Sequence, residues 1–186
     1  MVLKGILKGI INWYRKNKLI IFSNSVGRGT QICKGAYLTH SKIGNYCYLG
    51  MYSYFNCVQM GNYCSIAGNV TIGAMEHDYH DVSTSTFLSD SGYDDRITHI
   101  GNDVWIGAQC VIRQGITIGD GSVIGANSFV NKDVPPYSIV FGTPARIYKM
   151  RFDNDQIQSL LESKFWEYNP SQARKIIMDI KNGQRR

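Results

Sequence analysis

The feature of this sequence that most restricts its fold is an aliphatic residue that returns every six positions between residues 100 and 130. The series is Ile100, Ile106, Ile112, Ile118, Ile124 and Val130, and glycine follows four of its members. A period of six fits neither an α-helix, which turns about every 3.6 residues, nor a simple amphipathic strand. It fits a solenoid whose triangular coil contains three short strands, because a fixed short period indicates stacked supersecondary units.

The same reasoning predicts which side chains point into the solenoid. Residues two positions apart share one face of a strand, so we expect Val104 and Ile106 to point inward and Trp105 to point outward. Glycine after the aliphatic residue suits a corner of the coil, where a positive φ or a close backbone approach is easiest without a Cβ.

A less regular form of the repeat begins at Val26, with two steps of five residues instead of six. These shortened steps run from Leu38 to Ile43 and from Phe55 to Met60. Three strands per coil then give about five coils between residues 26 and 134. Prolines at 135 and 136 predict that a last partial coil ends nearby, because proline disrupts a strand pattern.

The repeat is interrupted once, after Ile72–Gly73, and resumes at Ile100. The intervening segment is polar and contains three of the four histidines, so we expect a loop over 75–97 that projects from a coil corner. Long loops on rigid scaffolds commonly have a functional role. This loop is therefore the first place to look for chemistry.

The solenoid is expected over 23–150, with helices on either side. The pattern of residues 1–22 predicts a basic amphipathic helix. The segment lacks the uninterrupted apolar run of about 20 residues that a membrane-spanning helix needs. Two interpretations remain open: the helix packs on the first coil or a neighbouring subunit, or it lies on an anionic membrane surface. Residues 151–186 predict two helices, one with Asp153 as N-cap and Gln156 closing a capping box, the other beginning at Asn169–Pro170.

The charge and the cysteine content indicate which partners and which cellular location to expect. The formal charge of +6 favours anionic partners such as phosphorylated cofactors. The basic residues gather at the termini and form no recognised nucleic-acid-binding module, so no nucleic-acid partner is predicted. Cys47, Cys64 and Cys110 fall in inward positions, and none of the five cysteines forms a CxxC zinc spacing. We therefore expect buried, reduced thiols in a cytoplasmic protein. The protein would be peripheral to the membrane if residues 1–22 bind it.

Four motifs, together with the hexads, carry a family resemblance: GNYCSIA (61–67), HDYHDVST (77–84), NDVWIGA (102–108) and GTPAR (142–146). Over about residues 26–150 the chain resembles the hexapeptide-repeat acyltransferases, in the branch that contains xenobiotic acetyltransferases and bacterial sugar O-acetyltransferases. The resemblance implies an all-β fold, a left-handed parallel β-helix that departs from the usual right-handed crossover rule. It also implies a homotrimer, with acetyl-CoA in the groove between two solenoids and the active site between subunits.

The resemblance also implies a catalytic base. In the family a loop histidine shortly before a Val-Ser-Thr sequence acts as general base, and His77 stands five residues before Val82. Acetyl transfer from a thioester to a hydroxyl requires removal of a proton near neutral pH, for which imidazole is suited. His80 is the second candidate, and a metal site at His77 and His80 lacks further ligands. A carboxylate is expected to orient the base, and the sequence does not choose among Glu76, Asp78 and Asp81.

The remaining site residues are predicted from the resemblance and from their place in the repeat. Trp105 and the backbone of the corner after it are expected to face the groove and stabilise the oxyanion, although Trp105 also suits packing in a trimer. Tyr52, Tyr54 and His80 are candidates for the acceptor pocket. The residues predicted to bind acetyl-CoA are Gly107, Ala108, Gly125, Ala126, Lys132, Pro144 and Arg146.

These observations predict an acetyl-CoA-dependent O-acetyltransferase that acts on a hydroxyl of a sugar or a cell-surface polysaccharide, by direct general-base attack. The basic N-terminal segment favours the glycan acceptor. Three alternatives remain open: a xenobiotic O-acetyltransferase acting on antibiotics of the chloramphenicol or streptogramin type, an amino-sugar N-acetyltransferase, and a non-catalytic solenoid scaffold.

Overall fold

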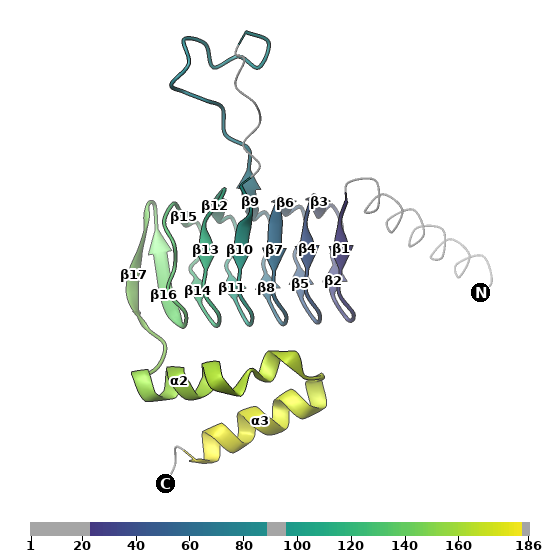
Figure 1. The fold of residues 1–186 in the computed structure, drawn as a ribbon, viewed down its shortest axis with the longest axis vertical. Helices are drawn as coiled ribbons and strands as arrows, with labels where there is room; N and C mark the ends of the chain where they lie inside the picture. Colours follow the sequence, from purple (N-terminus) through teal and green to yellow (C-terminus); the bar gives the residue numbers. More distant parts are fainter. Residues whose placement is uncertain (1–22, 89–95, 184–186) are drawn as a thin grey trace, which may run out of the picture.

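A computed structural model describes residues 23–88 and 96–183, and the predicted helix at 1–22 lies outside them. The chain winds into a triangular prism whose three sides are parallel sheets (Figure 1). The first sheet contains β1 (Ser25–Val26), β4 (Lys42–Ile43), β7 (Val58–Met60), β10 (Thr98–Ile100) and β13 (Thr117–Ile118). The second contains β2 (Gln31–Ile32), β5 (Tyr48–Leu49), β8 (Ser65–Ile66), β11 (Trp105–Ile106), β14 (Val123–Ile124) and β16 (Ser138–Gly142). The third contains β3 (Tyr37–Thr39), β6 (Tyr54–Asn56), β9 (Thr71–Ala74), β12 (Val111–Arg113) and β15 (Phe129–Val130).

This strand order confirms the predicted solenoid. Each sheet takes every third strand from β1 to β15, which gives five complete coils, and β16 begins a sixth. A bridge between Ile118 and Val134 carries the first sheet into that last coil. The parallel β-helix is consistent with the left-handed form that the resemblance implies.

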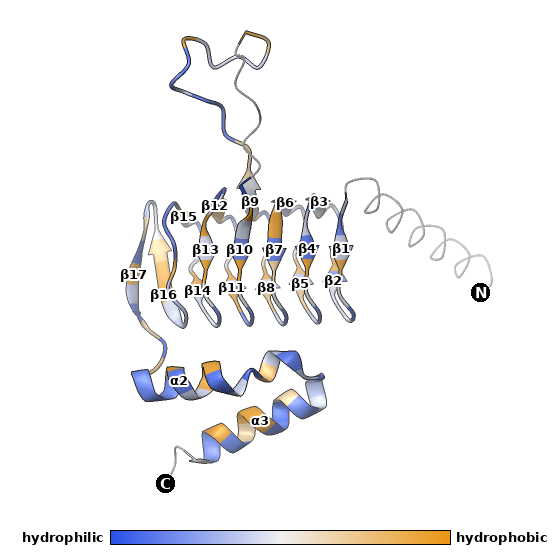
Figure 2. Cartoon of the chain, viewed as in Figure 1, coloured by the Kyte–Doolittle hydropathy of each residue, from blue (hydrophilic) through white to orange (hydrophobic). Residues whose placement is uncertain are grey.

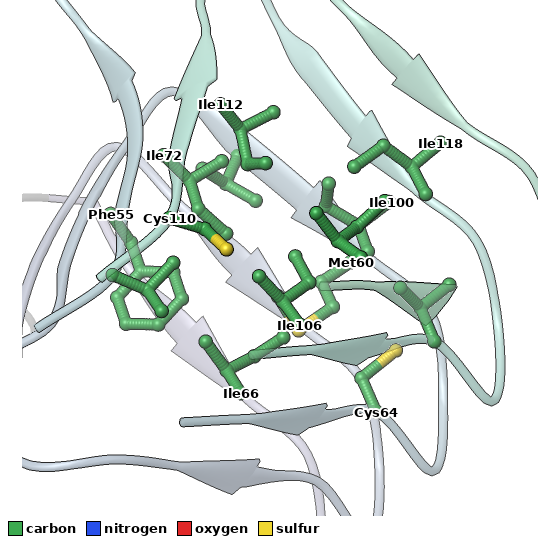
Figure 3. Close-up of a cluster of buried hydrophobic side chains, with 14 of the residues drawn as sticks. Phe55, Met60, Cys64, Ile66, Ile72, Ile100, Ile106, Cys110, Ile112 and Ile118 are labelled. Carbon is green, nitrogen blue, oxygen red and sulfur yellow. The ribbon is translucent and has the colours of Figure 1, made fainter. Parts of the chain in front are cut away.

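Inward and outward side chains alternate as the repeat predicts. Val104 and Ile106 are 1% and 0% exposed, whereas Trp105 between them is 55% exposed. Aliphatic side chains from all three sheets meet along the prism axis (Figure 3). Each contributes on the order of 1.5–3 kcal/mol through burial of apolar surface. The core therefore runs as one continuous column through every coil.

The inward cysteines are part of this column. Cys47, Cys64 and Cys110 are buried and free, which confirms the prediction of reduced packing residues. Burial raises the pKa of the Cys64 and Cys110 thiols, because the thiolate is the form that loses solvation.

Glycine at the corners serves close approach, and the positive φ values occur elsewhere in the coil. A Cβ on Gly107 would lie 2.6 Å from the backbone nitrogen of Ala126, in the next coil. Positive φ falls instead three residues after the inward aliphatic residue, at Asp103, Gln109, Gly115, Gly121 and Asn127. The coil thus needs both a close backbone approach and a positive φ, at different positions. Only the close approach explains the glycine that follows the inward aliphatic residue.

A ladder of side-chain oxygens, three from asparagine amides and one from a carboxylate, joins the coils at the corner between the first and second sheets; we call it the amide ladder. The Oδ1 atoms of Asn45, Asn62, Asn102 and Asp120 each accept a hydrogen bond from a backbone N–H in the preceding coil, at 2.6–2.8 Å. The donors are Arg28, Asn45, Asn62 and Asn102, so three of the residues both donate and accept. This explains why asparagine or aspartate follows glycine at this corner.

The C-terminal part closes the prism along this same corner. β17 (Ala145–Met150) pairs antiparallel with β16 and leads to α2 (Asn154–Ser163), the short 3₁₀ helix η1 (Phe165–Glu167) and α3 (Pro170–Gly183). Both helices mix hydrophobic and hydrophilic residues along their length (Figure 2), and their apolar residues pack with Tyr63 and Tyr137 of the prism. The Tyr63 hydroxyl donates to the Tyr168 carbonyl at 2.7 Å.

The helix starts agree with the sequence signals. Oδ1 of Asp153 accepts a hydrogen bond from the Gln156 backbone N–H at 2.8 Å, which confirms the predicted N-cap. Oδ1 of Asn169 accepts from the backbone N–H groups of Ser171 and Gln172, each at 3.1 Å. Within the described ranges no helix combines the length and the apolar character that crossing a membrane requires.

We expect Gly119→Ala to lower the free energy of unfolding by about 1–3 kcal/mol, because overpacking against fixed backbone is costly. The added Cβ would lie 2.4 Å from the backbone nitrogen of Pro136 in the next coil. Urea unfolding followed by circular dichroism measures the change.

Gly183→Ala is the matched control, since a Cβ there meets nothing within 4 Å. Equal stability of the two variants would contradict the proposed contact between coils.

Candidate active site

The predicted loop leaves the prism at one of its three corners. β9 of the third sheet ends at Ala74 and β10 of the first sheet begins at Thr98, so the loop leaves the prism and re-enters it at the corner between these sheets. We call this the loop corner. Figure 1 shows the loop projecting from one side of the prism, while α2 and α3 lie along the opposite side. Residues 75–82 are all exposed.

His77 lies in the exposed first part of the loop, and its ring contacts a backbone carbonyl. The distance from His77 Nδ1 to the Thr84 oxygen is 2.5 Å. A carbonyl oxygen only accepts hydrogen bonds, so the contact assigns the proton to Nδ1. Nε2 then carries the lone pair and is the nitrogen that can accept a proton.

The three carboxylates near His77 have other contacts. Glu76 forms two hydrogen bonds with Arg113, at 2.7 Å between Nε and Oε1 and 2.6 Å between Nη2 and Oε2. Oδ1 of Asp78 accepts from the backbone N–H of His80 at 2.8 Å. Oδ1 of Asp81 accepts from the backbone N–H of Val82 at 2.6 Å. The contact that fixes the His77 tautomer therefore comes from a main-chain carbonyl.

The second histidine of the loop lies against an aromatic ring. The His80 and Tyr79 ring centroids are 4.3 Å apart, and both residues are exposed. Among the described residues no group of three histidine, cysteine, aspartate or glutamate side chains could hold a metal ion.

Trp105 lies on a different side of the prism from the loop. It is an outward residue of β11 in the second sheet, with Ser65 and Val123 as its neighbours on the adjacent strands. In a three-sided prism the second sheet is opposite the loop corner. Within one chain, the structure therefore separates His77 from Trp105.

Most of the residues predicted to bind acetyl-CoA gather at the corner between the second and third sheets. Gly107–Ala108 and Gly125–Ala126 occupy this corner in successive coils, joined by a hydrogen bond from the Asn127 N–H to the Ala108 carbonyl at 2.9 Å. Thr143, which precedes Pro144, donates from its hydroxyl to the Asn127 carbonyl at 3.1 Å. We call Gly107, Ala108, Gly125, Ala126 and Pro144 the small-residue corner. Tyr52 lies at the same corner, two coils before Gly107, and is 58% exposed.

The other predicted residues are distributed around the prism. Tyr54 is an outward residue of β6 on the third sheet and stacks on Tyr37, with ring centroids 5.9 Å apart. Arg146 is exposed in β17, where its Nη1 donates to the Ala145 carbonyl at 2.9 Å. Lys132 follows β15 and lies toward the loop corner, so the structure does not bring it to the small-residue corner.

Arg113 is the residue of this region that sequence reasoning missed. The available signal was a departure from the repeat, because arginine follows Ile112 where glycine follows Ile100, Ile106, Ile118 and Ile124. This departure occurs in the strand that pairs with β9, from which the loop leaves.

Comparison with known proteins places the fold in a family. The model "Bacterial transferase hexapeptide (six repeats)" matches residues 40–74 and 97–132. The chain is 34% identical to a chloramphenicol acetyltransferase from Klebsiella aerogenes over 159 residues, covering 69% of this chain and 76% of that protein. It belongs to the hexapeptide-repeat acetyltransferase family.

One further relative and one solved structure bear on the site. Galactoside O-acetyltransferase from Escherichia coli K12 is 44% identical over 101 residues, covering 53% of this chain and 47% of that protein. A hexapeptide-repeat-containing acetyltransferase from Vibrio cholerae, solved in complex with acetyl-CoA, has a TM-score of 0.65 and 29% identity, covering 73% of this chain and 75% of that one. Matches at 50–52% identity span only 34–40% of the length of those relatives.

Trp105 is exposed and its neighbour Ile106 is buried, so we expect their substitutions to have different effects on stability. Trp105→Ala should change the free energy of unfolding by less than about 0.5 kcal/mol, because exposed side chains contribute little. Ile106→Ala should lower it by about 2–5 kcal/mol, because it leaves a cavity in the core. Thermal unfolding of the two variants makes the comparison. A loss for Trp105→Ala as large as for Ile106→Ala would show that the indole is packed against another surface.

Proposed function

We propose that this hexapeptide-repeat protein is an acetyl-CoA-dependent O-acetyltransferase in which His77 is the general base. The observation that carries the proposal is the exposed His77 imidazole, with Nδ1 held by the Thr84 carbonyl, in a loop displaced from a hexapeptide-repeat prism. The relatives support acetyl transfer: one is a chloramphenicol acetyltransferase, another a galactoside O-acetyltransferase, and the Vibrio cholerae neighbour contains acetyl-CoA.

The chemistry follows from the tautomer of His77. Nε2 accepts the proton of the acceptor hydroxyl while the hydroxyl oxygen attacks the thioester carbonyl carbon. Collapse of the tetrahedral species breaks the carbon–sulfur bond, and the imidazolium returns the proton to the departing thiolate. No covalent enzyme intermediate is needed. The Thr84 carbonyl stabilises the imidazolium that forms in between, because it accepts a hydrogen bond from Nδ1.

The small-residue corner suits the extended pantetheine arm of acetyl-CoA, which ends in the thioester. Ala108 and Ala126 are exposed there, and neither they nor the glycines beside them carry a side chain longer than a methyl group. A narrow chain such as pantetheine can approach the backbone along such an edge. Arg146 is an exposed cation on the adjoining strand β17 and can pair with phosphate.

The proposal requires a second copy of the chain. His77 lies at the loop corner, and the third sheet separates this corner from the small-residue corner of the same chain. A neighbouring prism can bring its own small-residue corner to this loop, so we include a homotrimer in the proposal. The free, buried cysteines support a cytoplasmic location. Membrane contact through residues 1–22 concerns a segment outside the described residues.

Two acceptor classes have equal support. A sugar hydroxyl, including one on a polysaccharide, agrees with the galactoside O-acetyltransferase relative. A xenobiotic hydroxyl agrees with the chloramphenicol acetyltransferase relative, of which the chain covers 76%. A screen of galactosides, oligosaccharides and chloramphenicol, read by mass spectrometry for the addition of one acetyl group, separates them.

We expect His77→Ala to lower kcat by a factor of at least about 10², the usual contribution of a general base. Binding of acetyl-CoA should persist, because the thioester is proposed to lie at another chain's small-residue corner. Transfer is measured by thiol release, and binding by the rise in Tm that a ligand selective for the native state produces.

His80→Ala is the matched control in the same loop and should keep most of kcat, because His77 is the proposed base. A role of His80 in the acceptor pocket would appear as a rise in KM for the acceptor. Absence of both transfer and a Tm rise at millimolar acetyl-CoA would contradict the enzyme and favour a scaffold.

A further inference from the structure

The loop contacts the prism immediately beside the proposed base. Residues 75–82 are exposed, and Glu76 among them reaches Arg113 at the end of β12. Arg113 pairs in the sheet with Ala74, the last residue of β9, across an irregularity in the register after Ile112. The arginine therefore stands next to the point where the loop leaves the prism.

The contact has a fixed geometry. Nε and Nη2 of Arg113 each donate to a different oxygen of Glu76, at 2.7 and 2.6 Å. A planar guanidinium that binds both carboxylate oxygens fixes orientation as well as distance, which a single charged contact does not. Glu76 is the residue before His77, so this geometry restricts where the His77 backbone can lie.

The return side of the loop lies over the same turn. A Cβ on Gly115 would lie 3.3–3.5 Å from three atoms of the Arg96 side chain, so Arg96 packs closely on this glycine. The Gly115 N–H also donates to the Thr98 hydroxyl at 3.1 Å. Both ends of the loop are thus positioned by residues 113–115, and only the Glu76 contact is adjacent to His77.

We propose that Arg113 is a positioning residue for acetyl transfer, holding Glu76 and thereby the neighbouring His77 at the loop corner. The inference rests on the proposed function. The two side chains are 37% and 36% exposed, so solvent screens their attraction and the pair contributes little to global stability. Its effect falls on the geometry of the base, where a displacement of about 1 Å can reduce the rate about 100-fold.

The test compares Arg113→Met and Arg113→Lys with the wild-type protein. Arg113→Met removes both hydrogen bonds, and we expect kcat to fall by about 10- to 100-fold with KM for acetyl-CoA changed by less than about 3-fold. Arg113→Lys keeps the charge without the two-bond geometry and should fall in between. Hydrogen exchange measured by mass spectrometry should become faster in residues 76–84 of Arg113→Met, with the Tm unchanged.

Two further variants complete the design. The exchanged pair Glu76→Arg with Arg113→Glu should recover part of the lost kcat, because the same ion pair can form in reverse. Arg174→Met, the same loss of charge on exposed α3, is the matched control and should behave like the wild type.

An unchanged kcat in Arg113→Met, beside an active wild type, would overturn the positioning role alone. A fall in Tm together with a rise in KM would also overturn it, because a general structural defect would then explain the loss. If the wild type transfers acetyl to no acceptor and His77→Ala changes nothing, the proposed function fails and the positioning role fails with it.

Discussion

The rest of the structure depends on the distance at which one coil can stack on the next. Backbone hydrogen bonds of 2.8–2.9 Å join successive coils at the corner between the first and second sheets, such as the Gly61 N–H to the Ile100 carbonyl and the Gly101 N–H to the Ile118 carbonyl. At this separation a Cβ on Gly101 would lie 2.7 Å from the Asp120 nitrogen, so glycine is required there. The amide ladder through Asn62 and Asn102 satisfies further N–H groups of the same corner. A prism built this tightly cannot accept an inserted residue within a strand, so an insertion must leave at a corner.

The long insertion follows this rule without disturbing the stack. Met60 and Ile100 pair directly across β7 and β10, although the loop separates them in sequence. Among the described strands that flank the loop, the register is irregular after Ile112, and this is where Arg113 extends to Glu76. The rigid prism and the loop that carries His77 are thus separate segments of the chain, and they meet beside Arg113. A rigid support of this kind can position a base in an exposed loop more accurately than the loop's own contacts can.

The period of six predicted the fold well, because it is set by local geometry that every coil repeats. It correctly placed the inward aliphatic residues, the buried cysteines and the insertion, and capping chemistry correctly predicted Asp153 as the N-cap of α2. It could not predict the contact between Arg113 and Glu76, 37 residues apart, because that contact depends on how the coils align after the insertion. Lys132 was predicted to bind acetyl-CoA from its late place in the chain, and the order of the strands puts it at the loop corner, after β15. Its role in binding stays a prediction. The role of His77 stays a prediction.

The chemistry of the three sides supports the assembly that the proposed reaction needs. Outward residues of the first sheet are polar, among them Lys42, Gln59, His99 and Thr117. The third sheet presents Tyr37, Tyr54, Val111 and Phe129, with Thr71 between Tyr54 and Val111. Aromatic and aliphatic residues in rows are typical of surfaces that contact another subunit. The third sheet is also the side that borders both the loop corner and the small-residue corner. Packing of a second prism against this side would bring the two corners of different chains toward one another, which is what a base on one chain and a thioester on the next require.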